Sequence, residues 1–141
     1  MKKLRRIILG LAIVCLMPTI PALAQIENGL DFTTSFPFYV GNAKMPAGSY
    51  KVTQADIDAE TLLIESTNGS HSALIAFIPT QSSQPHAKSD VTFHKYGDTE
   101  YLNRLWVEGQ KFGMKLEPTK VESKFAAKYK PVEHSVTGKK H

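Results

Sequence analysis

One continuous stretch decides the fold of this chain: Phe36-Pro37-Phe38-Tyr39-Val40-Gly41-Asn42-Ala43-Lys44-Met45-Pro46-Ala47-Gly48-Ser49-Tyr50-Lys51-Val52. Apolar side chains recur at every second position, which places Phe36, Phe38 and Val40 on one face of a strand. Two turn signals follow, because glycine reaches positive φ and proline presets its own φ. A second strand then carries Tyr50 and Val52 on one face. The stretch therefore predicts two neighbouring strands whose aromatic side chains face the core.

The same alternation extends on both sides of this stretch. It begins at Phe32, so we expect one strand from Phe32 to Val40. Pro37 marks an edge position or a bulge there, because proline donates no ladder hydrogen bond. Segment 72–78 is apolar on both faces, which favours a central strand or a sheet covered on both sides. Residues 79–90 are polar and aperiodic, and they predict a mobile surface loop. Further strands are expected at residues 50–54, 62–64, 91–96, 101–108 and 112–116.

Segment 101–108 is ambiguous by spacing alone. Leu102 and Trp106 fit a helix, whereas Tyr101 and Val107 fit a strand. We favour a strand, because the two-residue turn Gly97-Asp98 opens a strand-length segment.

The C-terminal part changes from strand spacing to helix spacing. A capping box, Thr119 followed by Glu122, opens a helix at about residues 119–130, in which each side chain satisfies a free backbone N–H of the first turn. Lysines lie on a separate face of this helix. Residues 132–141 show no periodicity, and we expect a disordered basic tail. The apolar face of the helix carries Val121, Phe125 and Tyr129.

These elements predict a mainly β fold. We expect a single antiparallel β-sandwich or partly open barrel of about seven strands, because tight turns join neighbouring strands. One C-terminal amphipathic helix would cover one end or face of it.

The N-terminus carries the pattern of a secretory signal peptide. Four basic residues precede an apolar run at residues 7–17, and Ala22-Leu23-Ala24 supplies small residues at the cleavage positions. The apolar run is shorter than the roughly 20 residues that a membrane-spanning helix needs. We therefore expect residues 1–24 to be removed, residues 25–131 to form the β-rich domain, and no transmembrane segment in the mature chain. Export implies a periplasmic or extracellular location.

Removal of the signal peptide changes the charge and cysteine arguments. The whole chain has net charge +4, but four of its basic residues and no acidic residue lie in residues 1–24. The remainder is neutral, so the composition does not indicate nucleic-acid binding. Cys15 is the only cysteine, and it leaves with the signal. The mature chain is thus expected to lack disulfides and thiol catalysis.

No residue pattern indicates a catalytic or metal site. Asp56, Asp58 and Glu60 alternate and could offer oxygen ligands to Ca²⁺, but the stretch lacks the glycine and later glutamate of an EF-hand loop. Ser70 precedes His71, and adjacent strand residues point to opposite faces, so we expect no cooperation between them. We therefore expect no enzyme activity, no cofactor and no metal.

The ordered set of short motifs resembles one group of proteins. The motifs are the opening stretch at residues 36–52, Phe93-His94-Lys95-Tyr96-Gly97-Asp98, Tyr101-Leu102, Trp106 and the segment from Gly113 to Glu122. Together they resemble small secreted proteins of unknown function of the acidobacterial type. The resemblance implies a single exported β-rich domain of a Gram-negative bacterium. It implies no activity, ligand or catalytic residue.

Function is therefore expected to be binding. The first hypothesis is a non-catalytic domain that binds a protein partner or the cell-envelope surface through a sheet edge or its basic end. The alternative is a protein that binds a small apolar ligand or a carbohydrate in a pocket between sheet and helix, since aromatic residues are numerous. The candidate ligand or partner surface consists of Tyr39, Lys44, His94, Tyr96 and Trp106.

Overall fold

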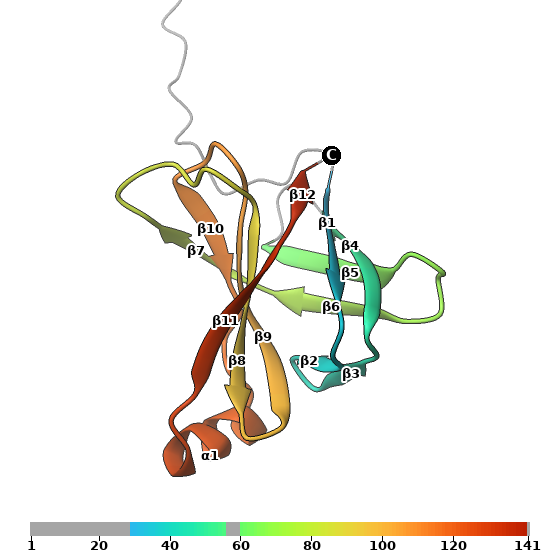
Figure 1. Cartoon of the computed structure of the whole chain (residues 1–141), viewed down its shortest axis with the longest axis vertical. Helices are drawn as coiled ribbons and strands as arrows, with labels where there is room; N and C mark the ends of the chain where they lie inside the picture. Colours follow the sequence, from blue (N-terminus) through green and yellow to red (C-terminus); the bar gives the residue numbers. More distant parts are fainter. Residues whose placement is uncertain (1–28, 56–59, 141) are drawn as a thin grey trace, which may run out of the picture.

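A computed structural model describes residues 29–55 and 60–140 of the chain. The expected signal peptide and the residues Asp56 and Asp58 lie outside this part. Within it, twelve strands form two sheets that are not closed into a barrel, and one helix lies near the C-terminal end (Figure 1). The predicted mainly β class with a C-terminal helix is therefore confirmed, and of the two expected architectures the sandwich is the one observed. The described residues form twelve strands rather than about seven, because bends and bulges divide several expected strands and the C-terminal segment adds two more. The described part contains no helix with the length and apolar character needed to cross a membrane.

Sheet A contains five antiparallel strands. Its central strands come from the first half of the chain, and its outermost strand comes from the C-terminal end. In spatial order the strands are β12 (Lys139–Lys140), β1 (Leu30–Thr34), β4 (Gly48–Gln54), β5 (Thr61–Ser66) and β6 (Ser72–Ala76).

Sheet B contains the other seven strands. Its main path runs in the order β11 (Val132–Thr137), β8 (Asp90–Tyr96), β9 (Thr99–Trp106), β10 (Phe112–Lys115) and β7 (Ile78–Gln81). The hairpin of β2 (Phe38–Val40) and β3 (Ala43–Met45) joins β9 through one parallel pairing, Tyr39 with Tyr101. The preference for a strand at residues 101–108 is confirmed by β9. The helix α1 (Lys120–Lys128) lies beyond the hairpin ends of β8 and β9 (Figure 1).

Aromatic side chains from both sheets meet in the core. Phe38 contacts Tyr50 with ring centroids 5.1 Å apart and Phe93 at 5.4 Å, and Phe32 stacks on Tyr50 at 5.5 Å. All four rings are buried. Fully burying such a side chain contributes about 1.5–3 kcal/mol relative to leaving it in water. The core-facing positions expected in the opening stretch are thus correct.

The opening stretch nevertheless differs from the single strand expected at residues 32–40. The chain bends after Thr34, whose hydroxyl donates to the carbonyl of Phe36 at 2.9 Å. β1 then belongs to sheet A and β2 to sheet B. Pro37 explains the break, because it has no N–H to continue a ladder. The alternating pattern survives because both strands face the same core from opposite sides.

Segment 72–78 was expected to be central, and this is wrong. β6 is the last strand of sheet A, and the side chain of Leu74 is 66% exposed. Its two apolar faces do not have two covering layers. Only one face enters the core, through Ala73, Ile75 and Phe77. Leu74 and Ile78 on the other face are exposed apolar side chains.

The expectation of a disordered tail at residues 132–141 is also wrong for the described residues 132–140. β11 pairs along its whole length with β8, and β12 pairs with β1. The imidazole of His134 packs against the rings of Phe36 and Phe93, with centroids 5.0 and 5.8 Å apart. A strand holds this segment because it completes one edge of each sheet. The loop expected at residues 79–90 begins as β7, and its remainder is tied to residues 110 and 111 by backbone hydrogen bonds.

Candidate binding groove beside the C-terminal helix

The position of α1 is fixed by local signals at both ends. Thr119 is its N-cap, and its hydroxyl accepts the N–H of Glu122 at 3.1 Å. At the other end Tyr129 returns to extended backbone, and its N–H donates to the carbonyl of Phe125. Pro131 follows, which favours the extended conformation of the residue before it. The helix therefore begins and ends close to where the sequence predicted.

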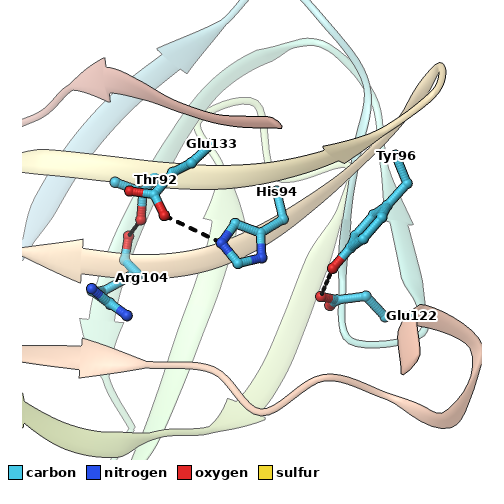
Figure 2. A network of polar contacts seen from close by, with 6 residues as sticks. All are labelled: Thr92, His94, Tyr96, Arg104, Glu122 and Glu133. Carbon is cyan, nitrogen blue, oxygen red and sulfur yellow. Dashed lines mark hydrogen bonds and ion pairs between the residues drawn. The ribbon is translucent and has the colours of Figure 1, made fainter. Parts of the chain in front are cut away.

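A buried glutamate attaches α1 to sheet B. The Glu122 carboxylate accepts a hydrogen bond of 3.0 Å from the Tyr96 hydroxyl, and both residues are buried (Figure 2). Burial raises the pKa of Glu122 above its usual value. Burial and the bond to Glu122 raise the pKa of Tyr96 to about 12. In the predicted capping box, this carboxylate would accept the backbone N–H of Thr119 at the start of the helix. It accepts the Tyr96 hydroxyl of sheet B instead.

A row of aromatic rings continues from α1 to β2. Phe125 lies 6.2 Å from the ring of Tyr96 and 6.3 Å from that of Tyr101, centroid to centroid. Tyr101 in turn stacks on Tyr39 at 5.2 Å, with the ring planes 23° apart. Burial is the main cause that raises the pKa of the Tyr101 hydroxyl. These rings form a continuous apolar surface between the helix and the β2–β3 hairpin.

Two adjoining hollows, which we call together the α1 groove, open along this surface. The first has a volume of about 300 Å³ and lies between α1 and the β2–β9 pair. The second has a volume of about 270 Å³ and follows the helix. Both are bordered by Val121 and Phe125, so they meet over the first turns of α1. The first is also lined by Tyr39, Gly41, Asn42, Thr99 and Tyr101, and the second by Lys124, Lys128 and Tyr129.

The apolar side of α1 faces outward along this groove. Val121 is 51% exposed and Tyr129 is 56% exposed, whereas Glu122 is only 6% exposed. Lys124 and Lys128 are exposed beside them. The groove therefore combines an aromatic floor, an apolar wall and two ammonium groups.

Of the five residues proposed from the sequence, two lie at or beside the groove, and a third, Tyr96, lies beneath it. Tyr39 is half-buried and lines it directly. Lys44 is exposed on β3 and lies opposite Tyr39 in the strand pairing. Tyr96 is buried beneath Phe125 and serves as the attachment point of the helix.

The other two proposed residues lie elsewhere. Nε2 of His94 is 3.3 Å from the carboxylate of Glu133 on β11, a side-chain hydrogen bond between β8 and β11 (Figure 2). Trp106 is buried at the opposite end of β9 from Tyr101, where its ring stacks on His86 at 4.1 Å. The structure therefore does not bring the five proposed residues together in one site.

The alternative hypothesis expected a pocket between sheet and helix, but it named no residue of the helix as lining that pocket. Val121 and Phe125 were recognised as one helical face, but that face was expected to cover the core. The length of the apolar face could have indicated an exposed helix, because three apolar residues between lysines offer little area to bury. What the sequence could not show was that Tyr96 would hold a glutamate inward.

A second buried polar contact holds β11. The Glu100 carboxylate lies 3.3 Å from Nε2 of His134, although this contact lacks hydrogen-bond geometry. Burial raises the pKa of Glu100, and nearby His134 and Lys95 lower it in part. This pair lies outside the α1 groove and links the C-terminal strand to β9.

The remaining candidate chemistry is sparse. The hydroxyl of Ser70 lies 2.9 Å from Nδ1 of His71, so the expectation that these two side chains diverge is wrong. The reason is that Ser70 lies in the exposed turn before β6, where its hydroxyl also bonds to Asn68. In the part of the chain that the structure describes, no three His, Cys, Asp or Glu residues are grouped to hold a metal ion.

Comparisons with protein-family models, with curated proteins and with solved structures gave no match for this chain.

Proposed function

We propose that this chain is an exported, non-catalytic binding protein whose site is the α1 groove. The ligand would be a small molecule with an apolar or aromatic body and an anionic group. One observation carries the proposal: α1 buries its glutamate and presents Val121 and Tyr129 to solvent. A helix that only covered the core would show the reverse arrangement. Contiguous exposed apolar side chains beside a hollow are typical of binding surfaces.

The lining of the groove supports this ligand class. A volume near 300 Å³ is at the lower end of the range for small-molecule sites. The stacked rings of Tyr39 and Tyr101 suit an apolar or planar body. Lys124 and Lys128 would attract an anion at the helix end of the groove. A carbohydrate is the alternative ligand, because sugar rings also stack on tyrosine and Asn42 and Thr99 could bond to hydroxyls.

The proposal is tested by adding one negative charge inside or outside the groove. The probe is 8-anilinonaphthalene-1-sulfonate, an aromatic anion whose fluorescence rises on binding. Val121→Asp places a carboxylate in the groove, while Ser123→Asp places one on the same helical turn outside the lining. Both positions are exposed, and an acid in the first turn of a helix favours folding.

We expect Val121→Asp to weaken probe binding by about tenfold or more, which corresponds to about 1.4 kcal/mol. Ser123→Asp should stay within about twofold of the unmodified chain. Equal affinities for the two variants would refute the groove as the site. Circular dichroism checks that both variants are folded.

The anionic part of the ligand is tested separately. The double variant Lys124→Gln, Lys128→Gln should weaken binding of the sulfonate probe but leave binding of the neutral N-phenyl-1-naphthylamine unchanged. The matched control replaces Lys88 and Lys111, two exposed lysines near the opposite end of sheet B. If both probes responded alike to the groove variant, the ligand would be apolar without a charge requirement.

Attachment to the cell-envelope surface is the second proposal, and the fold favours α1 over the C-terminal segment as the attachment element. Residues 132–140 are built into the sheets, so a free basic tail does not support it. The exposed lysines of α1 and its outward apolar face do, since this combination binds anionic membrane surfaces. Co-sedimentation with vesicles that contain anionic phospholipid, compared with vesicles of neutral phospholipid, tests it with the same lysine variants. Export itself rests on residues 1–24 and is tested by fractionation of cells.

A further inference from the structure

The free edges of the two sheets are not equally protected. An edge strand presents unpaired N–H and C=O groups, and proteins shield such edges with charged residues or proline. β12 consists of two lysines, β3 carries Lys44, β11 carries Glu133 and β7 carries Pro79. β6 has neither a charged residue nor a proline. The sequence from residue 66 to residue 87, which includes β6, contains no Asp, Glu, Lys or Arg.

The backbone groups on the open side of β6 can be identified. Phe77 donates its N–H to the carbonyl of Glu60 at 2.9 Å, and Ser66 donates to His71 at 2.8 Å. Antiparallel ladders alternate between hydrogen-bonded and non-hydrogen-bonded pairs. Because bonded pairs recur at every second residue, both bonds imply that Ala73 and Ile75 also bond to β5. The N–H and C=O groups of Ser72, Leu74 and Ala76 therefore point toward the free edge.

The side chains along this edge allow pairing with an identical strand. If β6 met a second β6 antiparallel, with a twofold axis at Leu74, Leu74 would face its own copy. Ser72 would then face Ala76 of the second copy, and each of these pairs could exchange both backbone hydrogen bonds. No like charges would meet, and the outer residues are small. Leu74, 66% exposed in the single chain, would gain a cross-strand apolar neighbour.

We propose that β6 is a self-association edge, at which sheet A of one chain continues into sheet A of a second copy. Such an interface is isologous, since the same strand serves both partners. It is also small, because strand pairing alone buries less than the roughly 1,200–2,000 Å² of a stable complex. The dimer is therefore weak, with a dissociation constant on the order of micromolar or above. This inference does not depend on the α1 groove.

The test uses the fact that Cys15 is the only cysteine of the chain. In a Cys15→Ser background, Leu74→Cys places one thiol at the expected axis. Residues of a hydrogen-bonded antiparallel pair have Cα atoms about 5.5 Å apart, within the range that a disulfide spans. Mild oxidation should then convert most of the protein to a covalent dimer. Val132→Cys is the control, because Val132 is 62% exposed on another edge strand, β11.

Sedimentation velocity over a concentration series provides the second readout. The unmodified chain should shift from monomer to dimer as concentration rises. Leu74→Lys should remain monomeric, because two ammonium groups would face each other across the axis. Thr137→Lys, which adds the same charge on the β11 edge, should dimerise like the unmodified chain. A chain that stays monomeric at all concentrations, or Leu74→Cys that cross-links no faster than Val132→Cys, would overturn the proposal.

Discussion

Replacing Gly113 by alanine is expected to destabilise the domain by about 2 kcal/mol, even though alanine adds only one carbon. A Cβ at this position would lie 2.5 Å from Cε3 of Trp106 and 2.8 Å from the carbonyl oxygen of Leu105. Ordinary contacts of this kind are 3.4–4 Å long. The indole cannot retreat freely, because it is 7% exposed and stacked on His86 with the ring planes 16° apart.

The expected loss of about 2 kcal/mol combines two destabilising effects with one that partly offsets them. Overpacking of this kind costs about 1–3 kcal/mol, and displacement of the indole from His86 adds about 0.5–1.5 kcal/mol. Alanine also restricts the unfolded chain, which offsets about 0.4–1 kcal/mol. Urea unfolding followed by fluorescence measures the difference, and the chain has a single tryptophan, so the signal reports on Trp106 itself.

A spectral change and a comparison variant test whether contact with Trp106 is the cause. The native emission of Gly113→Ala should shift to longer wavelength, because the displaced ring meets more water. Gly69→Ala is the comparison, since its Cβ meets no atom within 4 Å and only its positive φ opposes alanine. If Gly113→Ala changed the free energy of unfolding by less than about 0.5 kcal/mol with unchanged emission, Trp106 would not fill the space over Gly113.

Three other predictions concern the C-terminal elements and the opening stretch. Burial raises the pKa of Glu122 in the folded state, so its ionisation opposes folding and stability falls as pH rises through that raised pKa. Glu122→Gln should therefore melt at a higher temperature than the unmodified chain at pH 7–8, with the gain disappearing near pH 4; a gain that is constant with pH would contradict this cause. Tyr50→Phe removes the hydroxyl that donates to the carbonyl of Pro46 and should lower the free energy of unfolding by about 1 kcal/mol in urea titrations. Deleting residues 132–141 removes β11 and β12, and we expect no cooperative thermal transition to remain, since a domain of this size is stable by only about 5–15 kcal/mol; an unchanged melting temperature would mean that these strands contribute nothing.

The alternating pattern identified the core from sequence because burial acts on each strand locally. Phe38, Tyr50 and Val52 were assigned to inner faces, and all three are buried. The glycine of the Gly97-Asp98 turn has φ of 61°, the left-handed conformation that the expected hairpin requires. These features depend only on neighbours within a few residues, and that is why they could be predicted.

The errors arose where long-range pairing decided the result. Residues 132–137 looked aperiodic because a histidine takes one of the half-buried positions, between Phe36 and Phe93. Segment 72–78 looked central because periodicity reports how many faces are apolar, and it does not report whether a strand has one neighbour or two. The α1 groove depended on a partner for Glu122 that lies 26 residues away in the chain. No local pattern records such a partner.

The pairing of β12 with β1 has a consequence for how the molecule is made. Leu30 and Asp31, near the start of the described chain, take their outer neighbours from Lys140 and Lys139, near its end. Because β11 is likewise an edge strand of sheet B, neither sheet is complete until residues 132–140 have been synthesised. Contacts of such long sequence separation form slowly. A growing chain therefore has two incomplete sheets until β11 and β12 have been made, and complete folding can only follow their synthesis.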